Sequence, residues 1–272
     1  MQTRRNFLER GAKGVAAAGL CLPPLCAQDW ARQAVDRSPR KREWVAIKHG
    51  NRSVNSMVAH PQGAAKVPAV VVIHEIFGMT DWVESVTDEF AAAGFLAVAP
   101  DLLSGAAPNG GGTRDLQANQ IREVITKLPP DQVTADLNAV ADYAKSLPSC
   151  NGKVCVVGFS WGGGQAFRFA TNRKDLAAAF VFYGPGPDPA AIPNIQAPVY
   201  GFYAGNDERI NAGIPATQEQ MKAAGKFFEP VIYEGSAHGF MRAGAQPDAT
   251  EANAKARAAS WARLKEIRAK LG

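Results

Sequence analysis

Short apolar runs alternate with longer segments of helical periodicity along most of the chain. Six runs are continuous and apolar, at residues 67–74, 95–100, 153–159, 177–183, 197–204 and 227–233. Runs of this kind are typical of strands buried on both faces, as in a parallel sheet. Helical patterns fall between or after them, at roughly residues 80–93, 114–127, 131–146, 161–172, 214–224 and 248–270. The alternation predicts an α/β fold with a doubly wound, mostly parallel sheet.

The segments before the first buried run have other patterns. Residues 44–60 contain two alternating segments around Gly50-Asn51, which predicts an antiparallel N-terminal β-hairpin at the sheet edge. Residues 28–43 are charged and show no clear period, so we expect a leader segment on the surface. With 272 residues and 46% hydrophobic side chains, the chain can form one large core. We therefore expect residues 44–272 to make a single domain.

Residues 1–27 have the features of an export signal. Arg4 and Arg5 precede a weakly apolar stretch that ends near Ala27, which is typical of a twin-arginine signal peptide with cleavage after that residue. A short basic amphipathic helix is the alternative. A membrane anchor is disfavoured because the apolar stretch is short and contains two prolines. We therefore expect export by the twin-arginine machinery, to the periplasm or as a secreted protein.

Charge gives no indication of a nucleic-acid or membrane partner. The net charge is +5, but residues 1–27 hold four basic side chains against one acidic side chain, so the processed chain is near +2. Cys150 and Cys155 remain after the signal is removed. An extended span of five residues covers roughly 16 Å, which is too long for a disulfide between them. We expect two free thiols, with Cys155 in the core.

A Gly-x-Ser-x-Gly motif supplies the candidate nucleophile. It runs from Gly158 to Gly162, joins a predicted strand to a predicted helix, and has Ser160 at its centre. This is the context of a nucleophile elbow in the α/β-hydrolase fold. A sharp turn raises the serine above the sheet, and the flanking glycines keep crowded backbone free of Cβ atoms. The alternative is an ordinary glycine-rich turn between a strand and a helix.

A serine hydroxyl is a weak nucleophile near neutral pH, so it needs a base that a third group orients. In this fold the chain order is Ser, then Asp or Glu, then His. His238 is the one histidine that follows Ser160, and it comes just after the last apolar run. Asp207 follows the preceding run and is the expected acid. Glu208 and Asp188 are the alternatives, because both lie in loops after strands.

Two backbone amides are candidates for an oxyanion hole. In this fold one belongs to the residue after the nucleophile and the other to a loop after an earlier strand. These residues are Trp161 and Ile76 here. The glycine-rich segment 104–113 predicts a flexible loop that borders the site. Four aromatic residues near strand ends would line a substrate pocket or pack in the core: Phe77, Trp82, Trp161 and Phe240.

Several segments together resemble the dienelactone hydrolase family over nearly the whole processed chain. They are IHEIFGMTDWV, VAPDLLSG, NGKVCVVGFSWGG, YAGNDERI and EGSAHGFMR. The resemblance implies an α/β-hydrolase that uses no metal or organic cofactor and acts on an enol-lactone with a free carboxylate. It places Ser160 at the position of the family's cysteine nucleophile, with Asp207 and His238 completing the triad.

The resemblance also implies roles for three charged residues. Glu75 matches a glutamate that contacts the nucleophile in the resting enzyme, and burial should raise its pKa. The alternative for Glu75 is a buried carboxylate satisfied by backbone donors. Arg242 matches an arginine that binds the substrate carboxylate. Arg122 matches a second one, although the tyrosine that the family places four residues later is Thr126 here.

Serine in place of cysteine changes the expected substrate range. In the cysteine enzymes the thiol stays unreactive until an anionic substrate displaces the glutamate, whereas a serine depends on His238 at the moment of attack. We expect a monomeric hydrolase of small carboxylic esters or lactones, of the carboxymethylenebutenolidase type, that works through an acyl-serine intermediate and accepts anionic substrates. The alternatives are an acyltransferase or peptidase with the same triad, or a non-catalytic ligand-binding protein on this fold.

Overall fold

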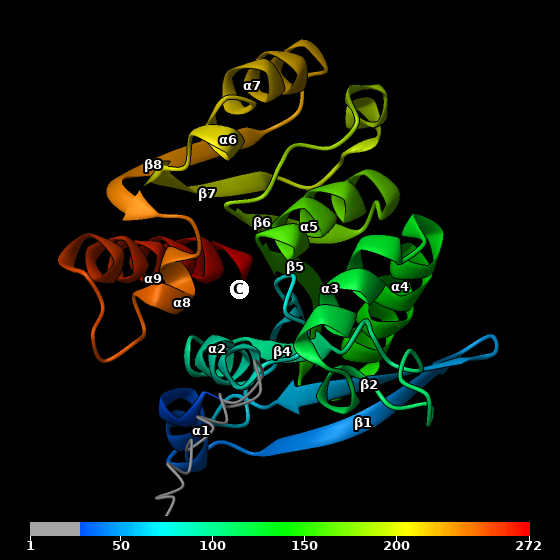
Figure 1. Cartoon of the computed structure of the whole chain (residues 1–272). Helices are drawn as coiled ribbons and strands as arrows, with labels where there is room; N and C mark the ends of the chain where they lie inside the picture. Colours follow the sequence, from blue (N-terminus) through cyan, green and yellow to red (C-terminus); the bar gives the residue numbers. More distant parts are fainter. Residues whose placement is uncertain (1–27) are drawn as a thin grey trace, which may run out of the picture.

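The computed structural model describes residues 28–272, so the predicted export signal lies outside the described residues. These residues form an eight-stranded sheet with the order β1-β2-β4-β3-β5-β6-β7-β8 (Figure 1). The strands are β1 (Arg42–His49), β2 (Arg52–Ala59), β3 (Val67–Ile73), β4 (Leu96–Pro100), β5 (Cys150–Phe159), β6 (Leu176–Phe182), β7 (Val199–Asn206) and β8 (Phe228–Ala237). β2 pairs antiparallel with β1 and β4, and all other neighbours pair parallel. The predicted sheet, with its antiparallel N-terminal hairpin, is confirmed.

Helices cover both faces of this sheet. They are α1 (Asp29–Asp36), α2 (Asp81–Ala92), α3 (Ala118–Lys127), α4 (Pro130–Ser146), α5 (Trp161–Asn172), α6 (Glu208–Asn211), α7 (Ile214–Ala223), α8 (Phe240–Ala243) and α9 (Glu251–Leu271). The helical patterns of the sequence all correspond to helices, with ends close to those expected. The pattern at 114–127 is divided between a 3-10 turn at Thr113–Asp115 and α3.

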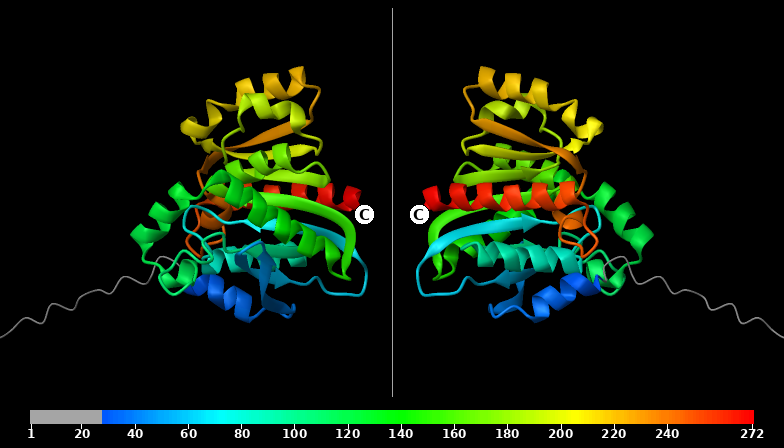
Figure 2. Two further views of the ribbon diagram at one scale, coloured as in Figure 1. Left: turned by 90° about the vertical axis from the view of Figure 1, so that its right-hand side faces the viewer. Right: turned by 90° about the vertical axis from the view of Figure 1, so that its left-hand side faces the viewer.

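Two apolar layers lie on opposite faces of the sheet. Successive residues of β3 alternate between them, so that Val71 packs with α4 and α5 while Val70 and Val72 pack with α2 and α9. Every residue of β3 is buried, which explains its continuous apolar sequence. Figure 2 shows the hairpin of β1 and β2 at one end of the sheet and β8 with α7 at the other.

Residues 29–36 form helix α1, in a segment for which no regular element was expected. Ala31 is fully buried, and Trp30 packs with the layer that contains α2 and α9. Half of its residues are apolar, but a helix of eight residues is too short to be stable alone, so it depends on packing against α2. This dependence on tertiary contacts is why the sequence pattern missed it.

Both cysteines lie on β5 and are free thiols, as expected. Cys155 is fully buried, and burial raises the pKa of its thiol to about 12. Trp82 and Phe240 are also buried in the core, so packing is the correct alternative for these two aromatics. None of the helices within residues 28–272 is both long and apolar enough to cross a lipid bilayer.

Candidate active site

Ser160 lies at a strained turn between β5 and α5. Its backbone has φ 55° and ψ −113°, and a conformation of this kind costs a non-glycine residue on the order of 1–3 kcal/mol. Ser160 N donates a hydrogen bond of 3.0 Å to Phe182 O on the neighbouring strand. A Cβ at Gly158 would lie 1.9 Å from Gly162 O, and a Cβ at Gly162 would lie 2.3 Å from His74 O. The motif therefore folds into the nucleophile elbow that it predicts.

The structure brings Ser160, His238 and Asp207 together at the carboxyl ends of β5, β8 and β7. Ser160 Oγ lies 2.8 Å from His238 Nε2, and His238 Nδ1 lies 2.5 Å from Asp207 Oδ2. The side chain of Asp207 is buried, whereas that of His238 is 33% exposed and open to substrate. The alternative acids do not reach the histidine, because Glu208 is exposed on α6 and Asp188 caps a 3-10 turn.

Tyr183 is a site residue that the sequence analysis did not identify. It lies at the end of β6 with φ 37°, one of two non-glycine residues with positive φ in the described chain. Its ring is fully buried and packs edge-on against His238, with 5.1 Å between the ring centroids. Burial raises the pKa of its hydroxyl well above the ordinary value. Tyr183 is therefore an uncharged side chain packed against His238. The Gly-Pro-Gly-Pro sequence that follows it was the one local sign of an unusual backbone turn at this position.

The amides of Trp161 and Ile76 are free to donate. Trp161 is the first residue of α5, so its N–H has no carbonyl within the helix to bind. Ile76 lies in the loop between β3 and α2. Among the hydrogen bonds within residues 28–272, neither amide is a donor. Two amides without an acceptor in these residues are available as donors for an oxyanion hole.

Glu75 is buried and pairs with Arg242 rather than with Ser160. Arg242 Nε donates a hydrogen bond of 2.7 Å to Glu75 Oε2. Burial raises the pKa of the Glu75 carboxyl, as expected, while the charge of Arg242 opposes the shift. The expected contact between Glu75 and the nucleophile is not formed in the described chain, because Ser160 Oγ bonds to His238 instead. Backbone donors do not satisfy Glu75 there either, since its hydrogen-bond partner is a guanidinium.

Arg242 and Arg122 meet at the ring of Phe77. Each guanidinium carbon lies 5.4 Å from the centroid of that ring, which is the distance of a cation–π contact. Arg242 comes from α8 and Arg122 is an exposed residue of α3. Within the described residues, the terminal nitrogens of both arginines donate no hydrogen bond to the protein. The structure thus brings the two predicted substrate-binding arginines together, and their terminal nitrogens are available to donate hydrogen bonds to a ligand.

Trp161, the residue after Ser160, packs against the ring of a histidine and against the segment 103–125. Its ring stacks on the ring of His74, with 5.5 Å between centroids, and burial lowers the pKa of that histidine. Trp161 and Ile76 also pack against an apolar cluster beneath α3, made of Leu103, Ala107, Leu116, Ile121 and Ile125. The loop predicted to border the site contributes Ala107 to this cluster. The part of the chain that the structure describes has no group of His, Cys, Asp or Glu placed to bind a metal ion.

A sequence model of the dienelactone hydrolase family matches residues 54–270, which is most of the chain. The chain belongs to the dienelactone hydrolase family. It is therefore a hydrolase, and the resemblance carried by the five sequence segments is confirmed. The match begins inside β2 and ends inside α9, so it includes every element that positions the site.

Two relatives and one solved structure are similar to this chain over most of its length. A protein of Methylorubrum extorquens named as a carboxymethylenebutenolidase is 30% identical over 234 residues, which cover 81% of this chain and 79% of the relative. One of the same name from Salmonella typhi is 29% identical over 219 residues, covering 76% and 78%. A crystal structure of a dienelactone hydrolase from Klebsiella pneumoniae matches with a TM-score of 0.73 and 24% identity, over 85% of this chain and 99% of that one. This likeness shows the α/β-hydrolase fold.

Proposed function

We propose that this dienelactone hydrolase family member is a serine hydrolase that cleaves carboxylic esters or lactones, with activity of the carboxymethylenebutenolidase type. The observation that carries the proposal is the hydrogen-bonded series from Ser160 Oγ to His238 Nε2, 2.8 Å, and from His238 Nδ1 to Asp207 Oδ2, 2.5 Å. A nucleophile, a base and a group that orients the base are the three parts that acyl transfer to serine requires.

The reaction follows from this geometry. Ser160 Oγ attacks the carbonyl carbon as His238 Nε2 takes the hydroxyl proton, and Asp207 keeps the imidazole in the tautomer that can accept it. The amides of Trp161 and Ile76 bind the oxyanion, and each such donor is worth about 3 kcal/mol in the transition state. Collapse expels the alcohol oxygen, which receives the proton from His238, and leaves an acyl-serine. Water then attacks the acyl group with His238 again as base, which releases the acid and restores Ser160.

The two arginines favour a substrate with a second, anionic group. Arg242 uses its Nε for Glu75, so its terminal nitrogens can bind a carboxylate without breaking the ion pair. Arg122, on α3, contacts the same ring of Phe77 as Arg242, which is on α8. An aliphatic ester without a carboxylate would lack these contacts but would still meet the triad. We therefore propose a broad ester and lactone hydrolase with a preference for anionic lactones.

The test combines labelling with a small substrate panel. Wild type, Ser160→Ala and Ser160→Cys would be assayed with p-nitrophenyl acetate, p-nitrophenyl butyrate and an enol-lactone that carries a carboxylate. Ser160→Ala should lose about 10⁴-fold or more in kcat, and a fluorophosphonate probe should label wild type at Ser160 alone. Turnover only with an added acyl acceptor or a peptide would favour the transferase or peptidase alternative. A chain that neither labels nor turns over any substrate would be a ligand-binding protein on this fold.

We propose further that the enzyme is exported as a folded monomer by the twin-arginine machinery and loses residues 1–27. The support is the sequence around Arg4 and Arg5 and the small residues that end at Ala27. Replacing both arginines with lysine should leave the protein in the cytoplasm at its full length. N-terminal sequencing of the exported wild type should begin at Gln28, and light scattering should give the mass of one chain.

A further inference from the structure

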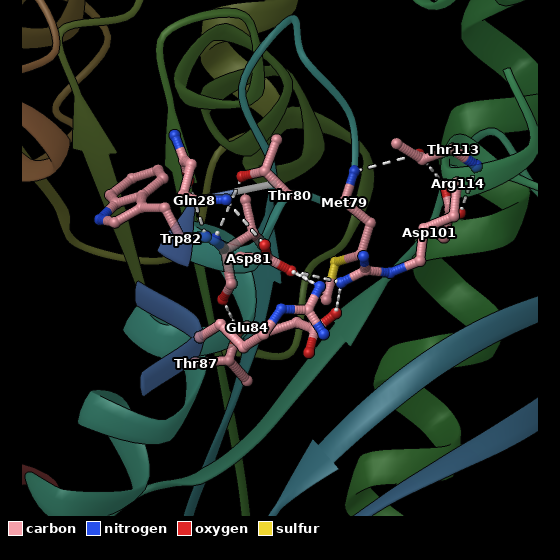
Figure 3. A network of polar contacts seen from close by, with 12 residues as sticks. Gln28, Met79, Thr80, Asp81, Trp82, Glu84, Thr87, Asp101, Thr113 and Arg114 are labelled. Carbon is pink, nitrogen blue, oxygen red and sulfur yellow. Dashed lines mark hydrogen bonds and ion pairs between the residues drawn. The ribbon is translucent and has the colours of Figure 1, made fainter. Parts of the chain in front are cut away.

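A buried carboxylate at the start of α2 accepts hydrogen bonds from three donors, two in residues 28–32 and one at Arg114 (Figure 3). Asp81, the first residue of α2, is 2% exposed. Its Oδ1 accepts hydrogen bonds from Arg32 Nη2 at 3.0 Å and Arg114 Nη2 at 2.7 Å. Its Oδ2 accepts one hydrogen bond within residues 28–272, from the backbone nitrogen of Gln28 at 2.8 Å. The cluster lies outside the catalytic triad, and the proposed reaction does not use it.

Gln28 is also hydrogen-bonded through its side chain and its carbonyl oxygen. Its side-chain Oε1 accepts a hydrogen bond of 2.9 Å from Trp82 N, the amide next to Asp81. Its carbonyl oxygen accepts from Ala31 N and Arg32 N and so starts α1. A residue at the very beginning of the described chain is therefore fixed by the first turn of α2. Chain ends are usually poorly ordered unless they are tied down in this way.

Gln28 is also the residue that becomes the N-terminus when the signal is removed after Ala27. Hydrolysis adds hydroxide to the Ala27 carbonyl and a proton to the Gln28 nitrogen, so the amide becomes a primary amine that is protonated at neutral pH. We propose that Asp81 is the docking site for this new α-ammonium group. The hydrogen bond from Gln28 N to Asp81 Oδ2, a neutral amide contact in the uncut chain, becomes an ion pair in the processed enzyme.

The charged groups at the docking site are two carboxylates and two guanidinium groups. Arg32 and Arg114 are 52% and 42% exposed, so water screens their share of the contact with Asp81. Glu84 also lies in the cluster. Arg114 Nη2 donates to Glu84 Oε1 at 2.5 Å as well as to Asp81, so Arg114 is shared between two carboxylates. Within residues 28–272, Asp81 Oδ2 is thus a buried acceptor to which no charged group donates. The amide contact is already assisted by the charge of the carboxylate, so what cleavage adds is the attraction between that carboxylate and the new positive charge.

The docking site directly follows the loop between β3 and α2, which carries the proposed oxyanion donor Ile76. The loop with Glu75 and Ile76 runs directly into α2, where Asp81 is the first residue. Arg114 follows Thr113, whose hydroxyl accepts a hydrogen bond of 3.0 Å from Met79 N in the same loop. The new N-terminus therefore stabilises the segment that carries one of the two oxyanion donors. The inference rests on the proposed processing, but it concerns a separate property, the stability of the processed chain.

The test is a cycle of two chain lengths and one substitution. The chains are 1–272 and 28–272, the latter released from a fusion so that Gln28 comes first and shown by mass spectrometry to carry a free amine. At pH 7 the Tm of 28–272 should exceed that of 1–272 by about 3 °C. Asp81→Asn should abolish that difference. Asp88→Asn is the matched control, because Asp88 is a similarly buried, arginine-paired carboxylate on α2 without contact to Gln28, and it should lower both chains equally.

Two results would overturn the proposal. One is an equal loss of Tm from Asp81→Asn in both chain lengths, which would mean that the amine adds nothing to the amide. The other is a gain in 28–272 that persists near pH 10, where an ordinary α-amine is neutral, because removal of the tail would then be the cause. The charged groups that face the amine are the same in both chains: Asp81, Glu84, Arg32 and Arg114. Ester hydrolysis in 1–272 reports the proposed function separately.

Discussion

Glu75 and Arg242, which are 167 positions apart in the chain, form an ion pair with 2.7 Å between Oε2 and Nε. A Cβ built on Gly239, the residue after His238, would lie 3.7 Å from Glu75 Oε1, so the pair supports the loop that carries the base. Ser160 Oγ bonds to His238 and leaves the carboxylate to the arginine. Under the proposed function, Glu75 therefore orients the arginine proposed to bind substrate, and it makes no contact with the proposed nucleophile Ser160.

Glu75→Gln is expected to remove a pH-dependent loss of stability. Burial raises the pKa of Glu75 above 4.5 in the folded protein, despite the opposing charge of Arg242. The unfolded chain therefore releases this proton first as the pH rises. The stabilising contribution is present below pH 4.5 and is lost as the pH increases through the folded pKa. In calorimetry from about pH 4 to 8, the Tm of wild type should fall relative to that of Glu75→Gln.

The exposed residue Glu234 provides the control for this measurement. Glu234→Gln should give a Tm profile parallel to that of wild type. Parallel profiles for Glu75→Gln and wild type would contradict the raised pKa. An unchanged rate and pH dependence of hydrolysis in Glu75→Gln would remove Glu75 from the functional site.

Asp207→Asn should lower kcat by about 10⁴-fold, because the amide would hold His238 in a tautomer that cannot accept the Ser160 proton. Glu208→Gln is the matched control: Glu208 is adjacent in sequence but exposed on α6. Its activity should stay within about twofold of wild type, since exposed substitutions away from a site cost little. Kinetics with p-nitrophenyl acetate would compare the two variants. A larger loss in Glu208→Gln than in Asp207→Asn would reassign the acid.

The triad could be read from the sequence because each member follows a strand that its own apolar run predicts. Ser160, Asp207 and His238 come after β5, β7 and β8, and the parallel sheet then brings their ends to one edge. The same logic could not find the Glu75–Arg242 pair. Which charged partner a buried carboxylate meets depends on where a distant loop lands, and no local pattern encodes that.

Two other features depended on tertiary contacts alone. Tyr183 is in the site because its φ of 37° turns its ring toward His238, and the sequence shows only a tyrosine before a glycine. Helix α1 forms because Gln28 and Ala31 are held against α2, although its eight residues are too few to make a stable helix by themselves. Propensity and periodicity describe a segment by itself, so contacts of this kind lie beyond them.

Gly162→Ala should destabilise the protein severely. The added Cβ would lie 2.3 Å from His74 O, a backbone atom that cannot move aside without shifting β3. Substitutions of this kind fall in the range of about 4 kcal/mol or more. Gly213→Ala is the control, since its Cβ would meet its nearest neighbour at 3.7 Å with φ −86°. It should be neutral or slightly stabilising, by about 0.4–1 kcal/mol. Urea denaturation of both would measure this, and equal midpoints would refute the close contact.

Cys155 should resist alkylation in the folded protein. Burial raises the pKa of its thiol to about 12, so the reactive thiolate is scarce at pH 8, and the side chain is fully buried in β5. Iodoacetamide should modify Cys155 only after denaturation, at a rate set by unfolding. Mass spectrometry with and without guanidinium would show it. Modification of the native protein within minutes would mean that β5 opens far more readily than its burial indicates.

Replacing either arginine with alanine should slow the hydrolysis of an anionic substrate more than that of an uncharged ester. Arg242→Ala removes a guanidinium whose terminal nitrogens have no hydrogen-bond partner within residues 28–272. Hydrogen bonds to charged groups are each worth about 1.5–3 kcal/mol, or roughly 10- to 100-fold in kcat/KM. We expect that loss for a carboxylate-bearing enol-lactone, and a much smaller loss for p-nitrophenyl acetate. Arg122→Ala should act in the same direction but more weakly, because Arg122 is exposed and screened by solvent.

Arg242→Ala also leaves Glu75 buried without its partner, so its effect needs a second variant. Arg242→Ala combined with Glu75→Gln removes the uncompensated charge while the substrate still lacks the guanidinium. If anion binding is the role of Arg242, the double variant should recover stability but not turnover of the anionic lactone. Recovery of both would make Arg242 a structural partner of Glu75, and the preference for anionic substrates would then have to come from Arg122.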